Sequence, residues 1–444
     1  MAASGGKWGY LVVFASFLVH MVACGIAYSC GAFYLRFLAE FKEGQFKSAW
    51  TGALMLAMIP IAGIPSTVIV YRLGARASVI LGGLLAALGF ALASFASRVW
   101  QTYTTLGIMT GAGFGFALTP SILILGDYYP GNTELPVNFA LSGVGLGMTF
   151  FPVVIQHLLD AYEWKTVFYI LAGMCGSIII AGVLMRPVRN SDKSYSKRDV
   201  LKIFEPSLCN CIPFVMLCLS NFIWSFGLSA LYHQLPEYAQ NVGGWGKDTM
   251  ILIAVVGISS FSSRAVFQLF SHSAKLDHIS IFLCTIGLTA ILTGLFPELF
   301  KYKSGQIGYA ILLGLHVGFW STFMSHISTE IIGSSYLAFG KGFIYLSLGA
   351  GLLLGAPVAS LIYELNSDYD IGFYLAGSCL LTPSIIMTGV NLGGNSYHQR
   401  LSNQIQMMNY TQKSLIANNT DVAEQMEEAE ETEEGEREEI STQV

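Results

Sequence analysis

Charged residues are scarce in this sequence. Only 11% of its 444 residues are Asp, Glu, Lys or Arg, and 53% are hydrophobic, whereas a soluble domain carries about 25% charged residues. The mean hydropathy is +0.57. This composition excludes an ordinary soluble domain and gives no basis for nucleic-acid binding. It indicates a protein that crosses the lipid bilayer several times.

Motifs of catalysis and metal binding are also missing. The sequence contains no Walker loop, no paired-carboxylate site, no nucleophile triad and no zinc-ligand spacing. Its eight cysteines lie in or beside apolar segments and form no CxxC pair, which predicts free thiols within the membrane. We therefore expect no enzyme activity, no catalytic residue, no cofactor and no metal site.

Long hydrophobic runs are abundant. Twelve of them are long enough to cross a bilayer as helices, which predicts an all-α membrane protein. The first is too long for a cleavable signal peptide. The runs are Tyr10–Leu35, Trp50–Val70, Ser78–Ala96, Thr102–Leu125, Asn138–Leu159, Thr166–Leu184, Ile212–Tyr232, Thr249–Phe270, Ile279–Leu295, Ile307–Ser328, Gly342–Tyr363 and Ile371–Val390.

Basic residues are unevenly distributed among the loops that connect the predicted helices. The loop 186–202 holds six basic residues, and cytoplasmic loops are enriched in Lys and Arg, so we place this loop and both termini in the cytoplasm. We expect six-helix halves at 1–185 and 209–392, a basic linker at 186–208, and an acidic disordered tail at 393–444. The tail is either only solvated or a docking site for a cytosolic partner.

A short internal sequence repeat relates the two halves. Pro152 and Pro357 each follow a glycine-rich run, and each precedes a Phe-Tyr pair by sixteen residues. Glycine lets helices approach closely and proline bends them. Two related six-helix halves around a central site predict the major facilitator fold.

Several segments resemble the monocarboxylate transporter family (solute carrier family 16). The resemblance covers residues 5–390. It lies in GGKWGYLVVF at the N-terminus, in the turn YRLGAR at 71–76, in GIMTGAGFGFALTPSILILGDYY and in DIGFYLAG at 370–377. It implies a plasma-membrane carrier that works by alternating access on a small monocarboxylate. It also implies a gate latch at Arg72, Gly74 and Arg76, and, for some members, a single-span accessory glycoprotein. Alternatively, Arg72 and Arg76 only fix the membrane orientation of the chain through their positive charge. Gly74 can adopt a left-handed conformation, which suits a turn.

The sequence departs from the family where a proton would be handled. Ala32 stands near the position of a lysine in helix one of the proton-coupled members, and Ser260 replaces an aspartate four residues before Arg264. Gly131 to Thr133 replace a basic cluster. We therefore do not expect lactate/proton symport of the founding type.

Arg264 lies within an apolar run, where an arginine costs roughly 2.5–3.5 kcal/mol on insertion scales. Because arginine binds carboxylates with two parallel hydrogen bonds, we expect it to receive a substrate carboxylate. The alternative is a structural pairing with backbone carbonyls, Glu330 or Asp127.

We place four further residues in the substrate site, namely Ser260, His316, Phe33 and Trp320. Packing within the bundle is the alternative for the histidine and the aromatic residues.

Three functions remain open at this point. The first is transport of simple monocarboxylates across the plasma membrane. The second is transport of larger carboxyl-bearing or zwitterionic solutes, such as amino acids, thyroid hormone or creatine. The third is a sensor or scaffold that no longer transports and acts through its acidic tail.

Overall fold

The computed structural model describes residues 6, 8–131, 133–187, 212–270, 278–332 and 337–392. It divides into two units, residues 1–387 and residues 388–444, and everything below concerns the first. Most of the predicted basic linker and all of the acidic tail lie outside the described residues.

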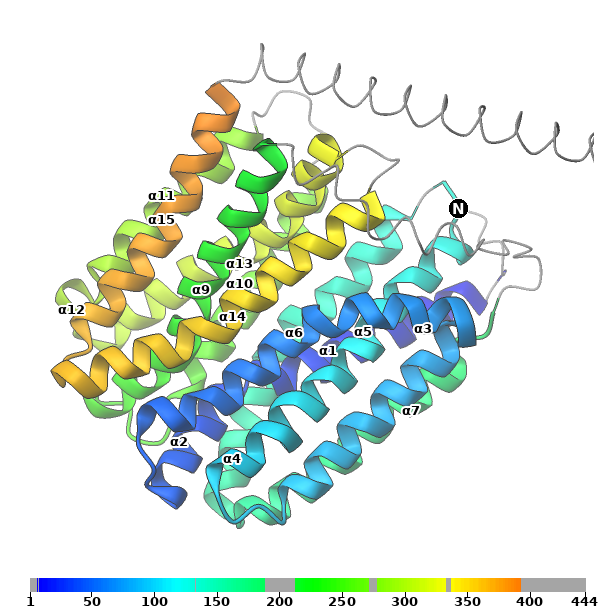
Figure 1. The fold of residues 1–444 in the computed structure, drawn as a ribbon. Helices are drawn as coiled ribbons and strands as arrows, with labels where there is room; N and C mark the ends of the chain where they lie inside the picture. Colours follow the sequence, from blue (N-terminus) through cyan, green and yellow to red (C-terminus); the bar gives the residue numbers. More distant parts are fainter. Residues whose placement is uncertain are drawn as a thin grey trace, which may run out of the picture. The chain divides into compact units, whose positions relative to one another are not determined.

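All regular structure in the described ranges is helical (Figure 1). Helices suit this composition, because a spanning helix satisfies its backbone hydrogen bonds within one segment. A first group of helices precedes residue 187. It consists of α1 (Trp8–Ala27), α2 (Cys30–Phe41), α3 (Gln45–Ala93), α4 (Val99–Thr102), the π-helix η1 (Tyr103–Thr110), α5 (Gly111–Tyr128), α6 (Glu134–Ala161) and α7 (Trp164–Leu184).

A second group follows residue 211. It consists of α9 (Ile212–Asn241), α10 (Met250–Phe270), α11 (His278–Gly294), α12 (Phe296–Leu299), α13 (Lys303–Ile332), α14 (Leu337–Asn366) and α15 (Asp370–Leu392). All twelve predicted apolar runs fall on helices. Eight described helices are long and apolar enough to cross a membrane, so a multi-pass membrane protein is confirmed. The count of twelve spans stays a prediction.

One helix boundary differs from the predicted runs, and another agrees with them. The first run, Tyr10–Leu35, is broken at Tyr28 and Ser29, where α1 ends and α2 begins. The second and third runs lie on the two parts of α3, which are joined at a kink where the backbone leaves the helical conformation at Gly74, with φ 84° and ψ 160°. The left-handed φ expected for Gly74 is therefore present, and it separates the two apolar parts of α3.

The helices α6 and α14 occupy equivalent positions in the two groups. Each packs against the first helix of its own group, α1 or α9, and each crosses to a helix of the other group, α10 or α3. The glycine-rich runs make these contacts close. A Cβ at Gly143 would lie 2.5 Å from the Phe17 carbonyl oxygen of α1, and one at Gly351 would collide with Phe222 and Ser225 of α9. The sequence repeat around Pro152 and Pro357 thus corresponds to two matching packing roles.

Candidate functional site

Arg264 lies on α10, where that helix contacts α6 of the first group. Its side chain is half-buried, and its Nη1 donates a hydrogen bond of 2.6 Å to the backbone carbonyl of Leu141 on α6. Its Nε is buried and has no hydrogen-bond partner. The guanidinium therefore bridges the two groups of helices while part of its donor capacity remains unused.

Close packing of α6 on α10 allows this reach. A Cβ at Gly145 would lie 2.8 Å from the backbone of Phe261, and one at Gly257 would lie 2.6 Å from the Thr149 nitrogen. The glycines therefore let the two backbones approach more closely than larger residues would allow. As a result, Arg264 reaches the carbonyl of the neighbouring helix directly.

No carboxylate pairs with Arg264 in the part of the chain that the structure describes. The ion pairs found there are Arg36–Glu40 and Lys47–Glu43, both within four residues along the chain. The side chain of Glu330, one expected alternative partner, lies outside the described residues. The hydrogen bond to Leu141 does agree with the other structural alternative, a pairing with backbone carbonyls.

Two tyrosines and a cysteine of α1 lie near Arg264. They are Tyr28, at the break between α1 and α2, Tyr232 of α9 and Cys24. The tyrosine rings meet edge to face, with centroids 5.0 Å apart. The Tyr232 hydroxyl is buried without a hydrogen-bond partner. This hydroxyl and Arg264 Nε are two unused polar groups in one neighbourhood.

Ser260 precedes Arg264 by one helical turn on α10, so both lie on one face of that helix. Ser260 is fully buried, and its hydroxyl has no hydrogen-bond partner. Helix α13 packs closely against Ser260, because a Cβ added to Gly318 of α13 would lie only 2.6 Å from the Ser260 carbonyl oxygen. Arg264 and Ser260 are the two predicted site residues that the structure places on one helix face.

His316 and Trp320 form a separate cluster with Trp224. The Trp224 indole donates a 2.9 Å hydrogen bond to His316 Nε2, and the two tryptophans stack at 4.4 Å between centroids. Since Nε2 accepts, the hydrogen of the neutral imidazole is assigned to Nδ1, which is buried without a partner. No contact with Arg264 involves His316 among the described residues.

Phe33 lies among aromatic side chains of the first group. It is 2% exposed and packs at 6.4 Å and 5.7 Å from Phe90 and Phe168. This position agrees with the packing alternative left open for the aromatic residues.

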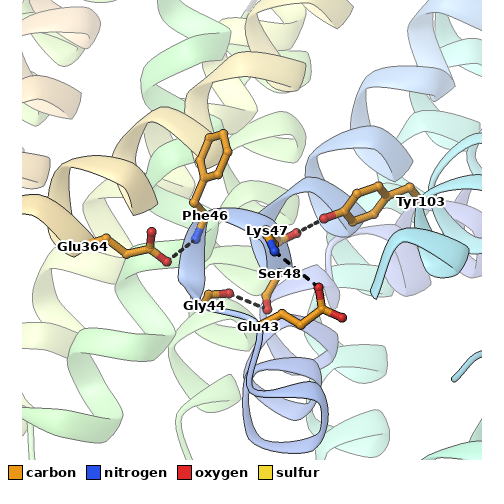
Figure 2. Close-up of polar contacts among 7 residues, drawn as sticks. All are labelled: Glu43, Gly44, Phe46, Lys47, Ser48, Tyr103 and Glu364. Carbon is orange, nitrogen blue, oxygen red and sulfur yellow. Dashed lines mark hydrogen bonds and ion pairs between the residues drawn. The ribbon is translucent and has the colours of Figure 1, made fainter. Parts of the chain in front are cut away.

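The turn between α2 and α3 carries a polar cluster that the sequence analysis missed. We call it the Gly44 latch and define it by Tyr34, Gln45, Phe46, Glu237 and Glu364. Glu237 of α9 accepts hydrogen bonds from the Tyr34 hydroxyl at 2.9 Å and from the Gln45 amide at 2.5 Å. Glu364 of α14 accepts the Phe46 backbone N–H at 2.9 Å (Figure 2). Both carboxylates belong to the second group, and all three donors belong to the first.

Figure 2 shows the Glu364 carboxylate directed at the first turn of α3. The free N–H groups and the dipole of a helix N-terminus favour a negative charge there. Gly44 precedes this turn with φ 95°, and a Cβ on it would lie 2.7 Å from Glu364 Oε1. Within the first group, the Tyr103 hydroxyl donates a 2.6 Å hydrogen bond to the Lys47 carbonyl, which stabilises the same first turn of α3 (Figure 2).

One sequence signal could have pointed to the latch. Glu237 and Glu364 are acidic residues just beyond two apolar runs, Ile212–Tyr232 and Gly342–Tyr363. Taken singly, such residues are usually solvated helix ends. Only the packing of α9 on α2 and of α14 on α3 brings them to one turn.

The predicted gate at Arg72, Gly74 and Arg76 lies at the bend of α3. All three residues are exposed, and a Cβ on Gly74 would meet nothing within 4 Å. Neither arginine takes part in an ion pair with any described residue. A latch at this turn is therefore not formed in the described residues of this structure.

Taken together, two matched groups of apolar helices with a polar residue between them agree with the architecture of major facilitator transporters. Residues 14–356 match the family model of the Major Facilitator Superfamily, and the chain belongs to that superfamily. The family and its relatives identify a transporter and not an enzyme.

Curated relatives confirm the resemblance found in the sequence, and the chain is a divergent member of the monocarboxylate transporter family. It is 24% identical to monocarboxylate transporter 12 of Homo sapiens, over 94% of this chain and 84% of the relative. It is 24% identical to monocarboxylate transporter 13 of Bos taurus, over 86% and 89%. It is 26% identical to monocarboxylate transporter 3 of Rattus norvegicus, over 90% and 82%.

Solved structures confirm the fold. A mutant of the nucleoside transporter NupG aligns with a TM-score of 0.68 at 12% identity, over 86% of this chain and 99% of that chain. The peptide transporter POT in complex with sulfate aligns with a TM-score of 0.67 at 14% identity, over 89% and 95%. At this identity the likeness concerns the fold alone.

Proposed function

We propose that this secondary transporter carries a small solute with a carboxylate group, and that Arg264 binds the carboxylate. One observation supports this proposal above the others: the guanidinium lies between the two groups of helices with a backbone carbonyl as its hydrogen-bond acceptor and an unused Nε. A partly buried cation that pairs with no carboxylate among the described residues is costly. A carboxylate bound by two parallel hydrogen bonds would remove much of that cost.

Further unused groups could hold the rest of the solute. The Tyr232 hydroxyl and the Ser260 hydroxyl are buried without partners, and an unsatisfied buried hydroxyl costs about 1–3 kcal/mol. A polar group near the solute carboxylate would satisfy one or both. The names of the relatives favour simple monocarboxylates, while the loss of the family lysine at Ala32 and of the aspartate at Ser260 favours larger or zwitterionic carboxylates.

The position of Arg264 also fits an alternating-access cycle. Its hydrogen bond to Leu141 joins α10 to α6, so a solute that took over the guanidinium would change a contact between the two groups of helices. Binding and rearrangement would then share one residue. We further propose that the protein resides in the plasma membrane with the Gly44 latch on the outer side and the Gly74 bend on the cytoplasmic side.

Uptake into liposomes containing only the purified protein tests the carboxylate anchor. The panel contains labelled lactate, pyruvate, a ketone body, amino acids, thyroid hormone and creatine. We expect Arg264→Gln to lower carboxylate uptake about 10- to 100-fold, because charge-assisted hydrogen bonds are worth about 1.5–3 kcal/mol each. Arg264→Lys keeps the charge but not the two parallel bonds, so its uptake should lie between those of Arg264→Gln and the parent.

Arg98→Gln is the matched control, because Arg98 is an exposed arginine outside the proposed site. It should transport as the parent does. Equal uptake by the parent and both Arg264 variants would reject the anchor. No uptake of any carboxylate by the parent would reject the proposed cargo and favour the sensor or scaffold alternative.

A further inference from the structure

We propose that Glu237 is a proton-binding site built into the Gly44 latch, so that closing this end of the carrier is linked to the uptake of one proton. The inference rests on the proposed carrier function, because only a carrier opens and closes this end during its cycle. It assigns a role to a residue outside the carboxylate site.

The first argument is the environment of Glu237. Its side chain is 3% exposed, although it lies five residues beyond the apolar run that ends at Tyr232. Both carboxyl oxygens are in contact with hydrogen-bond donors, the hydroxyl of Tyr34 and the amide of Gln45. No described cation lies within ion-pair distance of it. A carboxylate buried in this way is held only by neutral groups.

The other neighbours of Glu237 are also uncharged or remote from it. Tyr369, in the turn between α14 and α15, also lies near Glu237, and burial raises the pKa of Tyr369, which therefore stays neutral. His233 lies one turn earlier on α9, with its ring 5.7 Å from the ring of Tyr34. From α14, Ser360 contacts Tyr34, and the charged Glu364 contacts the Phe46 N–H.

The second argument is the position of Glu237 between the two groups of helices. Tyr34 belongs to α2 and Gln45 to α3, so both hydrogen bonds must break when the first and second groups separate at this end. The carboxyl group then enters water. Burying an unpaired ionised carboxylate costs several kcal/mol, and a bound proton removes that cost.

The sign of the linkage follows from these two states. A protonated Glu237 favours the closed latch, and an ionised Glu237 favours the open one. Closure should therefore be promoted at low pH and lost as the pH rises. The chain would then respond to protons even though the family lysine and aspartate are replaced by Ala32 and Ser260.

The test measures closure directly and needs no solute. Fluorophores are attached at positions 162 and 302, which are exposed residues outside the latch at the same end of the two groups. Single-molecule energy transfer in lipid nanodiscs then reports the closed fraction from pH 5.5 to pH 8. We expect the ratio of closed to open molecules in the parent to fall at least threefold over this range.

Three variants separate proton binding from a merely structural role. Glu237→Gln mimics the protonated group: its amide oxygen accepts one hydrogen bond, and its NH2 can donate to Gln45 Oε1, which has no partner, once that amide turns over. Its closed fraction should therefore stay high at every pH. Glu237→Ala removes the bonds and should open the latch at every pH. His233→Gln should keep the pH response of the parent, as should Glu163→Gln, an exposed carboxylate at the same end.

A flat profile in the parent, or a profile in Glu237→Gln that matches a responsive parent, would overturn the proposal. Loss of the response in His233→Gln but not in Glu237→Gln would assign the proton to the histidine and also overturn it. None of these outcomes depends on Arg264 or on the cargo. A failed uptake screen and a failed proton site therefore remain distinguishable.

Discussion

The first part of α3 lies between Gly44 and Gly74. These two glycines have similar backbone conformations, but only Gly44 is contacted by the other group of helices. Gly44 and Gly74 both have a positive φ, 95° and 84°. At the Gly44 end, carboxylates of α9 and α14 contact Gln45 and the first turn of α3. At the Gly74 end, a Cβ would meet nothing within 4 Å, and the neighbouring Arg72 and Arg76 are exposed.

This difference places the contact with the opposite group at Gly44 and not at Gly74, and we expect closure to depend on that contact and not on the turn itself. A glycine with positive φ lets the chain change direction in both places. Only at Gly44 does a residue from the other group of helices make contact. The proposed alternating-access cycle would need such a difference, because its two ends open in turn.

The largest difference between the two ends is expected when each glycine is substituted by alanine in turn. Each change should cost roughly 1–3 kcal/mol, because both glycines combine a positive φ with an extended ψ, a conformation open essentially to glycine alone. Only Gly44→Ala also places a Cβ 2.7 Å from Glu364 Oε1. We expect Gly44→Ala to lower the ratio of closed to open molecules about tenfold and Gly74→Ala to change it less than twofold, as measured by the same energy-transfer pair at pH 6.

Thermal unfolding of both variants controls for the shared strain. The two midpoints should fall by similar amounts, because the backbone conformation is similar at both sites. An equal loss of closure in both variants would mean that strain alone, and not contact with Glu364, governs this end.

A smaller effect is expected from Glu364→Gln. The amide oxygen can still accept the Phe46 N–H, but the negative charge at the α3 N-terminus is lost, which is worth about 0.3–1 kcal/mol. The ratio of closed to open molecules should fall about two- to fivefold, and the effect should shrink at high salt.

Glu43→Gln provides the matched control on the same turn. Its surface ion pair with Lys47 stays within the first group of helices, so it should not change closure. If Glu43→Gln opened the latch as much as Glu364→Gln does, the charge of the turn and not the contact between the groups would be responsible.

The sequence predicted much of the fold because its signals are local. Apolar runs, the positive φ of Gly74 and the glycine-rich runs before Pro152 and Pro357 each depend on one short segment. The interruption of α3 at Gly74 agrees with the two separate runs predicted on either side of it, because glycine is a usual place for a chain to leave a helix. Nothing in the run Tyr10–Leu35 indicated the break at Tyr28, since a short interruption does not alter its apolar composition.

The candidate site was predictable only in part. Arg264 is visible because a cation in an apolar run is costly wherever that run lies. Glu237 was not, because its burial depends on Tyr34 and Gln45, which are about two hundred residues away along the chain. His316 and Trp320 were predicted singly as cargo contacts, and the structure adds Trp224 as the residue that joins them.

The smallest effect on closure is expected from the paired change Arg72→Gln and Arg76→Gln. Because both arginines are exposed and lack ion-pair partners among the described residues, the ratio of closed to open molecules at the Gly44 end should change less than twofold. If they latch the opposite end in the other state of the carrier, solute exchange should still change severalfold, since that state would lose stability. Unchanged closure with unchanged exchange would instead assign them to anchoring of topology, and a large loss of closure would show that the two ends are not independent.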